Sequence, residues 1–574
     1  MENTESRKMC GSRIFLETLV KEGVDTIFGY PGGQIMNVYD ALYDYVDQIR
    51  HILVRHEQGA VHAAQGYARM TGRPGVVTVT SGPGATNAIT GVADAMIDST
   101  PLVVITGQVG TALLGTDAFQ ETDVLGMTIP ITKWSYQIRS AEDISWAVSR
   151  ALYIASSGRP GPVVLDFTRD AQAGMAEFRY EKCNFIRSYI PYPKVDAEAV
   201  RQAAKMIDEA ERPLLIFGQG ITISSSENEL RELVEKADLP ATATLLGLGA
   251  MDSEHPNYIG MAGMHGNIAS NVMTQECDLL IAVGMRFDDR VTGKTSVYAK
   301  QAKIIHIDID ASEIGKNVPV DLGILGNAKE VLPMLTALVS KADHAQWRKR
   351  ADECYTVENA EVIEPVIHPS SGYVRMGEAV KVVSEVCRGE AVIVTDVGQN
   401  QLFGARYSSY RTNRSMLTSG GLGTMGFGLP AAIGAKVGAP DRQVVLFVGD
   451  GGLQMTMQEL GTIMQEETGV KIVLLNNNWL GNVRMWQQLF WDKRYSFSHM
   501  LNPDYSSIAK AYGIGYRQVE NREDLREAVE QMFSDERAFL LDIHVEEEDV
   551  IMPMVPPGKS VNEIMLSETK WFKC

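Results

Sequence analysis

The sequence predicts an α/β fold in which three doubly wound domains, each with a mainly parallel sheet, follow one another. Short apolar runs recur along the chain and are continuous rather than alternating, which is typical of strands covered on both faces. Helical patterns separate these runs, as in βαβ units. The length of 574 residues is too great for one hydrophobic core and suits three domains of about 200 residues or fewer each.

The first predicted domain covers residues 1–180. An amphipathic helix from Ser12 to Lys21 ends at Gly23, because helices commonly end at a glycine. The strands predicted after it are VDTIF, VVTVT, PLVVIT and PVVLDF, and each runs into glycine or a polar residue. From Gly174 to about Val195 the chain loses its period and gains aromatic residues and prolines, which predicts a surface linker.

Two further domains are predicted over residues 190–345 and 370–560, followed by a tail over 561–574. The predicted strands of the middle domain are PLLIFG, ATATLLG, DLLIAVG and AKIIHIDID, and those of the last domain are AVIVTDVG, VVLFVGDGG, KIVLLNNN and FLLDIHV. Residues 341–369, between the two domains, are polar and charged and are predicted to form a second linker.

The composition excludes several classes of protein. Lysine and arginine number 53 against 72 acidic residues, and the net charge of −19 repels nucleic-acid backbones and anionic lipid surfaces. No apolar run is long enough to span a membrane, and the amino terminus lacks the apolar core of a secretory signal. The six scattered cysteines form no CxxC pair and indicate reduced thiols. We therefore expect a cytoplasmic protein that binds neither nucleic acid nor membrane.

Two strand ends in the last domain carry candidate metal ligands. VVLFV runs into GDGG (449–452), and KIVLL runs into NNN (476–478). Parallel sheets bind ligands beyond the carboxyl ends of their strands, so Asp450 and Asn477 can share one ligand. Their oxygens suit Mg²⁺, whose remaining ligands would be phosphate oxygens and water. Either tract alone is equally well explained as turn-forming sequence. Together, with one helix-length segment between them, they resemble the GDG…NN signature of thiamine diphosphate enzymes.

A carboxylate in the first domain, Glu57, lies at the start of an alanine-rich helical pattern in RHEQGA (55–60). Taken alone, an acid in a first helical turn is most simply a solvated residue that favours the helix dipole. A thiamine diphosphate site offers a second interpretation, because that cofactor needs a buried carboxyl group that holds a proton against its aminopyrimidine ring.

Nearly the whole chain resembles acetohydroxyacid synthase, the family also called acetolactate synthase. The motifs that carry the resemblance occur in the order of the family, and they are FGYPGG (28–33), RHEQGA (55–60), TSGPGATN (80–87), GTDAFQE (115–121), RFDDRVTG (286–293), TSGGLGTMGFGLPAA (418–432), GDGG (449–452), NNN (476–478) and PMVPPG (553–558). The resemblance implies the thiamine diphosphate-binding fold of pyruvate oxidases and decarboxylases, with a pyrimidine-binding first domain, an FAD-binding middle domain and a last domain that binds diphosphate and Mg²⁺.

The resemblance also implies roles for residues at both ends of the chain. Glu57 would activate the cofactor, and Met425 would wedge between its two rings. The Mg²⁺ ligands would be Asp450, Asn477 and the backbone carbonyl of Trp479. Further contacts with thiamine diphosphate are implied at Pro31, Gly32, Gly398, Gln399, Gly423, Gly449, Gly451 and Gly452.

The substrate pocket is implied on the same basis. Gly33 and Gln120 would border the reacting carbon, while Phe119, Arg169 and Met425 would line the pocket. Many family members carry Pro-Lys-Asp where this chain has Thr-Arg-Asp (168–170), so charge is kept at position 169 but a role specific to lysine is not expected there.

Two residues bear on the choice of substrate. Taken alone, Arg290 is most simply explained as an ion-pair partner of the neighbouring acids. The resemblance implies instead that it would bind the carboxylate of the second 2-ketoacid. Trp486, otherwise an ordinary packing residue, would favour an acceptor with an extra methylene, so 2-ketobutyrate should compete well against pyruvate.

The middle domain matches the FAD-binding region of the family, in which the flavin takes no net redox part. A GxG after a strand is a weak signal by itself. The residues implied to contact the flavin are Arg159, from the first domain, and Gly218, Gly220, Gly263, Met264, His265, Gly284, Arg286, Asp288, Arg290 and Asp308. Asn327 replaces an aspartate common near the flavin and Asn482 replaces a common methionine, which would shift flavin or inhibitor affinity without changing the reaction.

The implied reaction decarboxylates pyruvate and joins the remaining hydroxyethyl unit to pyruvate or 2-ketobutyrate. The products would be 2-acetolactate and 2-aceto-2-hydroxybutyrate, precursors of valine, leucine and isoleucine. Each cofactor in this family lies between two chains, which implies a homodimer or a dimer of dimers. Feedback control would need a separate small regulatory subunit.

Two alternatives remain open at this point. A pyruvate oxidase, a glyoxylate carboligase or a flavin-free catabolic acetolactate synthase would share the scaffold, but Glu57 argues against the carboligase, and RFDDRVTG with Trp486 argues against the other two. The second alternative is a catalytically idle nucleotide-binding or regulatory subunit, against which Glu57, Asp450 and Asn477 argue together.

Overall fold

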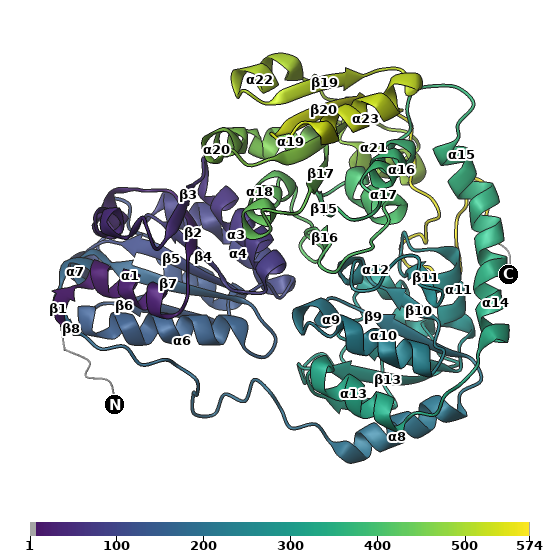
Figure 1. The fold of residues 1–574 in the computed structure, drawn as a ribbon, viewed down its shortest axis with the longest axis horizontal. Coiled ribbons are helices and arrows are strands. Elements are labelled where there is room, and N and C mark those ends of the chain that lie inside the picture. The colour runs from purple at the N-terminus through teal and green to yellow at the C-terminus, as the bar shows by residue number, and fades with distance from the viewer. Residues whose placement is uncertain (1–6, 573–574) are drawn as a thin grey trace.

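The computed structural model describes residues 7–572, and within them it contains three six-stranded parallel sheets (Figure 1). The first sheet has the order β3-β2-β4-β5-β7-β6, and its neighbouring strands are all parallel. Its strands are β2 (Thr26–Gly29), β3 (Arg50–Leu53), β4 (Gly75–Val79), β5 (Leu102–Gln108), β6 (Trp134–Ile138) and β7 (Pro162–Thr168). The helices of this domain are α1 (Gly11–Lys21), α2 (Met36–Leu42), α3 (Glu57–Thr71), α4 (Pro83–Ile97), α5 (Val124–Thr128), α6 (Ile144–Ser156) and α7 (Arg169–Ala173).

The middle domain has the sheet order β11-β10-β9-β12-β13-β14. Its strands are β9 (Pro213–Phe217), β10 (Ala241–Ala243), β11 (Tyr258–Met261), β12 (Leu279–Val283), β13 (Lys303–Asp308) and β14 (Leu322–Leu325). Its helices are α8 (Ala197–Glu209), α9 (Gly220–Ile223), α10 (Glu227–Lys236), α11 (Ile268–Glu276), α12 (Asp289–Thr292) and α13 (Ala328–Leu338). α8 buries its residues 200, 203, 204 and 207, a spacing that places them on one helical face.

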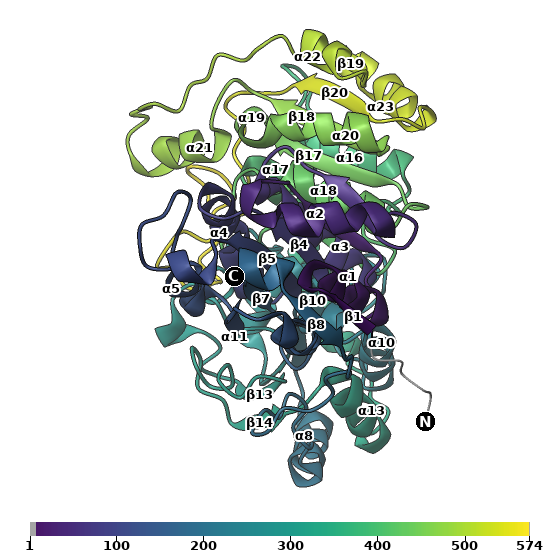
Figure 2. The same ribbon diagram turned by 90° about the vertical axis from the view of Figure 1, so that its left-hand side faces the viewer.

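The last domain has the sheet order β16-β15-β17-β18-β20-β19. Its strands are β15 (Val392–Thr395), β16 (Met416–Leu417), β17 (Val444–Gly449), β18 (Val470–Asn476), β19 (Gly515–Val519) and β20 (Phe539–His544). Its helices are α16 (Met376–Val386), α17 (Gln399–Tyr407), α18 (Gly428–Gly438), α19 (Asp450–Thr456), α20 (Leu460–Glu466), α21 (Gly481–Phe490), α22 (Tyr505–Ala511) and α23 (Leu525–Ser534). Figure 2 turns the first domain toward the viewer, with the last domain above it and the middle domain below.

The predicted α/β fold with parallel sheets is confirmed, but two predicted linkers are partly wrong. The first contains β8 (Met175–Phe178), which pairs antiparallel with β1 (Arg7–Cys10); only the stretch after it runs as an extended trace to α8 (Figure 1). The second contains α14 (Ala345–Glu358), a π-helical turn (Asn359–Ile363) and α15 (Glu364–Ile367). α14 buries Trp347, Ala351, Cys354 and Glu358, and this helical spacing was masked by the charged residues between them.

The first and last domains pack through α3 and α18, which lie side by side (Figure 1). The contact requires glycine on both helices. A Cβ on Gly66 would lie 2.0 Å from the carbonyl oxygen of Ala431, and one on Gly434 would lie 1.7 Å from that of Ala63. Because no side chain separates the two backbones there, α3 and α18 pack in direct backbone contact, and the two domains lie closely against each other.

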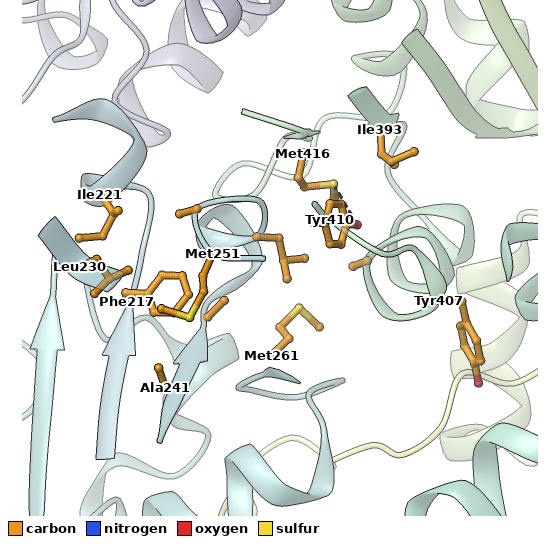
Figure 3. Close-up of a cluster of buried hydrophobic side chains, with 14 of the residues drawn as sticks. Phe217, Ile221, Leu230, Ala241, Met251, Met261, Ile393, Tyr407, Tyr410 and Met416 are labelled. Atoms are coloured by element: carbon orange, nitrogen blue, oxygen red, sulfur yellow. Dashed lines mark hydrogen bonds between the residues drawn. The ribbon is translucent and has the colours of Figure 1, made fainter. Parts of the chain in front are cut away.

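A hydrophobic core joins the middle and last domains. It includes Phe217 and Ile221 of the middle domain together with Ile393 and Tyr410 of the last (Figure 3). All four side chains are buried, so these two domains share one core rather than a solvated interface. Within the described residues, no helix combines the length and the apolar character needed to cross a bilayer.

Candidate active site

Glu57 occupies the first position of α3, directly beyond the carboxyl end of β3. Its Oε2 accepts a hydrogen bond of 2.9 Å from Asn87 on α4. Its Oε1 lies 3.3 Å from the point where a Cβ on Gly84 would sit, so the glycines of TSGPGATN leave space around the carboxylate. The side chain is half-buried in this chain rather than fully buried as the resemblance implies, and it remains accessible to a ligand.

The residues expected beside the reacting carbon gather at the same sheet edge. Gly33 is exposed, and a Cβ there would meet nothing within 4 Å, whereas Gly32 packs on Thr80 at the end of β4. Gln120 has a left-handed φ of 61°, and its backbone packs on Gly82 at the start of α4. The exposed Pro31, before these glycines, belongs to the same loop.

Two other predicted pocket residues lie on the surface of the chain. The side chain of Phe119 is 85% exposed, although the loop around it is ordered by Glu121, whose carboxylate accepts hydrogen bonds from the backbone of Thr116 and Ala118. Arg169 is also exposed, at the first position of α7 beyond the end of β7. Neither side chain is enclosed by the residues described here.

Two helix starts correspond to the two halves of the diphosphate site that the resemblance implies, and the first of these is the start of α17. Gly398 has a φ of 143°, which favours glycine, and it precedes the first residue of α17. That residue, Gln399, is buried, and its Nε2 donates to the backbone oxygen of Asp549 at 2.7 Å. Its Oε1 is buried without a partner among the described atoms, which is the sign of a missing polar ligand.

The start of α19 corresponds to the other half. β15 and β17 are neighbours, so α17 and α19 begin at the same edge of the sheet. A Cβ on Gly451 would lie 2.7 Å from Leu480, and one on Gly452 would lie 2.6 Å from Asp396. Both positions are therefore closely packed, while Gly449 precedes α19 as its N-cap and supplies no capping side chain.

The proposed metal ligands meet at the ends of β17 and β18, which pair in register. Burial raises the pKa of Asp450 to about 6, and a hydrogen bond of 2.8 Å from Asn502 partly opposes this rise. A buried carboxylate without a cation is costly, so the site favours a bound metal. Asn477 Nδ2 is buried without a partner. This atom and Gln399 Oε1 both lie close to the point that a Cβ on Gly481 would occupy.

The donor set suits Mg²⁺ better than a zinc-type metal. Asn477 Oδ1 accepts the N–H of Trp479 at 3.1 Å, which orients the carbonyl of that residue. No cluster of three or more His, Cys, Asp or Glu side chains that could hold a metal occurs between residues 7 and 572. A cation at Asp450 would therefore draw most of its ligands from phosphate and water, as Mg²⁺ does.

Met425 lies across from this edge, with its methyl group 3.5 Å from the position of a Cβ on Gly451. It follows Gly423, whose φ is 72°. The backbone after Met425 is held by Asp396, a fully buried acid that accepts the N–H groups of Gly426 and Gly428 at 3.0 and 2.8 Å. Burial raises the pKa of Asp396 to about 6, and these hydrogen bonds oppose the rise.

One cavity of about 1350 Å³ connects the middle domain with the last. Its wall includes Gly398, Gly423 and Trp486 from the diphosphate side, and also Asn327 and Asn482. The flavin residues implied by the resemblance that line it are Arg159, Gly218, Gly220, Met264, His265, Gly284, Arg286, Asp288, Arg290 and Asp308. Gly263 lies behind this wall, where a Cβ would be 2.6 Å from the carbonyl oxygen of Arg290.

The cavity fits a large polar cofactor. A Cβ on Gly220 would lie 2.6 Å from the Cα of Gly284, so the ends of β9 and β12 present bare backbone. His265 Nδ1 is buried without a partner, and burial lowers the pKa of this histidine to about 3. Arg159 reaches across from the first domain and pairs with Asp310 and Glu313 at 3.1 and 2.7 Å.

Arg290 and Trp486 both reach this cavity. The Asp288 carboxylate accepts the backbone N–H of Arg290 as the cap of α12, and the guanidinium is 3.8 Å from Asp289 with its side chain 61% exposed. The ion-pair explanation for Arg290 is therefore weak, and its charge is available to an anion. Trp486 packs on Phe490 with ring centroids 5.2 Å apart.

The predicted site residues thus form two groups in one chain. Glu57, Gly33 and Gln120 lie at the edge of the first sheet, whereas Asp450, Asn477 and Met425 lie at the edge of the last. Within residues 7–572, no hydrogen bond joins the two groups. Sequence reasoning missed Asn87, Asn502 and Asp396; only Asn87 carried a signal, because it closes the TSGPGATN motif.

Comparisons with known proteins identify the family of the chain. Three family models match, namely the N-terminal TPP binding domain (residues 9–127), the central domain (200–335) and the C-terminal TPP binding domain (396–543) of thiamine pyrophosphate enzymes. The chain is 43% identical over 558 residues to the acetolactate synthase large subunit of Lactococcus lactis, which covers 97% of this chain and 96% of that protein. It is 42% identical over 562 residues to the acetolactate synthase isozyme 2 large subunit of Escherichia coli, with 97% and 99% covered. The similarity extends over almost all of both chains, and this chain therefore belongs to the acetolactate synthase large subunit family of thiamine pyrophosphate enzymes.

Proposed function

We propose that this chain is the catalytic subunit of an acetolactate synthase. It would convert two pyruvate molecules into 2-acetolactate and carbon dioxide, and pyruvate with 2-ketobutyrate into 2-aceto-2-hydroxybutyrate, in the biosynthesis of branched-chain amino acids. The observation that carries the proposal is the presence, at two sheet edges, of a half-buried glutamate held by Asn87 and of a buried Asp–Asn pair beside orphaned polar atoms.

The residues at these two sheet edges would have different roles in binding and activating the cofactor. Thiamine diphosphate supplies, when bound, a carbon nucleophile that can accept and release an acyl unit. Asp450, Asn477 and the Trp479 carbonyl would hold Mg²⁺ against the diphosphate. Glu57 would hold a proton at the aminopyrimidine ring, and its bond from Asn87 fixes the orientation of the carboxylate.

The second 2-ketoacid would be bound on the cavity side. Arg290 presents an exposed guanidinium, which can pair with the substrate carboxylate through two parallel hydrogen bonds. Trp486 and its neighbour Phe490 give the adjoining wall an apolar face, which would favour the longer acceptor 2-ketobutyrate. Both groups bind and orient the acceptor rather than transfer protons.

FAD is proposed for the cavity of about 1350 Å³. The bare glycine backbone at 218, 220 and 284 and the orphaned His265 Nδ1 support a dinucleotide there. Arg159 lines the same cavity with its guanidinium paired to Asp310 and Glu313. Since the reaction has no net oxidation, the flavin would stabilise the fold of the cavity rather than exchange electrons with the substrate.

We also propose that the active form is a homodimer or a dimer of dimers. Glu57 is only half-buried, and Phe119 is 85% exposed, so both lack a covering surface in one chain. A second chain that brings its Asp450 edge to this Glu57 would complete the site. Both relatives are named large subunits, which supports a separate small regulatory subunit. The free thiols of Cys10, Cys183, Cys277 and Cys387 support a reducing, cytoplasmic location.

A competition assay tests the proposal. The purified chain is supplied with thiamine diphosphate, Mg²⁺, FAD and pyruvate, with and without 2-ketobutyrate, and the products are identified by mass. Acetohydroxybutyrate should dominate in the mixture. Acetyl phosphate, or carbon dioxide without a ligated product, would refute the assignment.

A further inference from the structure

The loop of residues 418–426, which carries Met425, is attached to two buried acids of another domain. The loop follows β16 in the last domain, whereas Asp94 and Asp98 lie at the carboxyl end of α4 in the first. Both acids are at most 1% exposed. The function described above leaves them without a role, although each contacts the loop directly.

Asp98 binds the backbone of the loop. Its Oδ1 accepts the N–H of Gly421 at 2.7 Å, and its Oδ2 accepts the N–H of Gly420 at 2.9 Å. The same Oδ2 pairs with Arg69 on α3 at 3.0 Å. Arg69 in turn donates to the carbonyl oxygen of Thr418 at 2.6 Å. Three consecutive peptide groups of the loop are therefore fixed by one ion pair.

Asp94 binds the hydroxyl groups of the loop. Its Oδ1 accepts from Thr424 at 3.0 Å and from Ser419, while its Oδ2 accepts from Gln65 at 3.0 Å. Ser419 Oγ also accepts the N–H of Thr424 at 2.9 Å. The residue immediately before Met425 is thus held both by its side chain and by its backbone.

We infer that Asp98, with Asp94 and Arg69, is a positioning residue that sets the place of Met425 against the diphosphate edge. Gln401 and Asp396 of the last domain fix the two ends of the loop, at Thr418 and Gly426. The residues between them include three glycines, which permit many backbone conformations, and Leu422 and Gly423 are exposed. Two acids with one guanidinium in a buried site are not favoured for stability alone, because desolvation costs as much as the pairing returns.

The Asp98 carboxylate is stabilised both by the Arg69 cation and by the N–H groups of the loop. Burial raises the pKa of Asp98; the Arg69 guanidinium opposes this rise, and the Asp94 carboxylate adds to it. The charge of Arg69 is therefore the main stabilising influence on the Asp98 carboxylate, the N–H of Gly420 adds to it, and each carboxylate oxygen faces a loop N–H donor.

Asp98 accepts from backbone N–H groups of the loop, whereas Asp94 accepts from its hydroxyl groups, and this difference makes two matched substitutions informative. In Asp98→Asn, both oxygen positions face N–H donors, so the amide nitrogen must oppose one of them wherever it points. In Asp94→Asn, the nitrogen can replace Oδ1 and donate to the hydroxyl groups of Ser419 and Thr424, which can also accept. Asp98→Asn should therefore displace the loop much more than Asp94→Asn.

The first readout is amide hydrogen exchange of the full chain without cofactor, measured by mass spectrometry. In Asp98→Asn, the peptide that covers residues 418–426 should exchange about tenfold faster or more, because one of its N–H groups loses its acceptor and faces an amide nitrogen instead, while peptides of β17 and β18 stay unchanged. Glu466→Gln is the control. It removes an ion pair of 3.0 Å with Arg50 between the same two domains and should leave the loop as it is in the unaltered chain.

The second readout is a double-mutant cycle on kcat, and this part rests on the function proposed above. Asp98→Asn should lower kcat about tenfold or more, with the KM for pyruvate changed less than about threefold. Met425→Ala should have its own cost, and the double variant should lose little more than Met425→Ala alone, because both changes affect the same contact.

Two results would overturn the inference. One is unchanged exchange of peptide 418–426 in Asp98→Asn; the other is a double variant whose loss equals the product of the two single losses. If Asp98→Asn does not fold, Gly421→Ala replaces it, because its Cβ would lie 2.8 Å from Asp98 Oδ1 and would push the loop away with both acids intact. An unaltered chain that does not act on pyruvate would refute the proposed function and leave the exchange result standing.

Discussion

A buried acid beneath the Gln120 loop should make the stability of the first domain depend on pH. Asp166 on β7 is 0% exposed. It accepts hydrogen bonds from Gln137, Thr106 and Gln108 at 2.7, 2.8 and 3.1 Å. Gln108 also donates to the carbonyl oxygen of Thr122 at 2.9 Å, two residues after Gln120. Asp166→Asn keeps these bonds, since its amide oxygen can accept from both glutamines while its nitrogen donates to the Thr106 hydroxyl.

The size of the effect follows from the titration of Asp166. Burial raises the pKa of this carboxyl from 3.8 to about 6 against the effect of its three donors. The folded chain therefore holds the proton more tightly than the unfolded chain. The resulting stabilisation is complete below pH 3.8 and is lost as the pH rises through about 6. At about 1.4 kcal/mol per pH unit the whole interval corresponds to about 3 kcal/mol, of which about 2 kcal/mol should be lost between pH 4.5 and 7.

The assay is amide hydrogen exchange of peptides from β5 and β7 under increasing urea, which reports the opening free energy of this domain alone. The quantity compared is the difference between the unaltered chain and Asp166→Asn at each pH, so that other titrating groups cancel. A flat difference from pH 4.5 to 7 would refute the reasoning. Asp170→Asn is the control, with an effect of opposite sign. Burial tends to raise the pKa of Asp170, but hydrogen bonds from Thr111 and Thr168 outweigh it and lower that pKa. This acid therefore stabilises the fold more as the pH rises.

Three further substitutions test the proposed site. Glu57→Gln should retain thiamine diphosphate affinity but lower kcat by roughly 10²-fold or more, because the amide cannot exchange a proton. Steady-state kinetics and a binding titration measure the two quantities, and an unchanged kcat would remove Glu57 from the mechanism. Trp486→Leu should lower the preference for 2-ketobutyrate by roughly fivefold, the factor that corresponds to ~1 kcal/mol for a methylene, and an unchanged product ratio would remove Trp486 from acceptor selection. Asp450→Ala should weaken Mg²⁺ and thiamine diphosphate together by roughly 10–100-fold or more, and calorimetry that finds Mg²⁺ binding intact would exclude Asp450 as a ligand.

The strand ends were predictable because local sequence determines both the strand and the turn that follows it. Asp450 and Asn477 end consecutive parallel strands that are neighbours in the sheet, so one rule of α/β architecture brought them together. The contacts of Asn502 with Asp450 and of Asp98 with Gly420 were not predictable in this way. They depend on how loops and whole domains pack, which no local period specifies.

Three of the residues that sequence reasoning did not single out share one chemical property, which explains why they were missed. Asp98, Asp396 and Glu459 are buried acids that accept backbone N–H groups of another segment, at Gly420, Gly426 and Arg55 respectively. In a sequence, such an acid cannot be told from a solvated one, because its partner is a peptide group that every residue carries. A ligand-binding acid such as Asp450, by contrast, lies among glycines that the ligand requires. Glycine-rich context therefore marks the residues that touch a cofactor, whereas the residues that hold those glycine-rich segments in place become visible only when burial and hydrogen bonding are known.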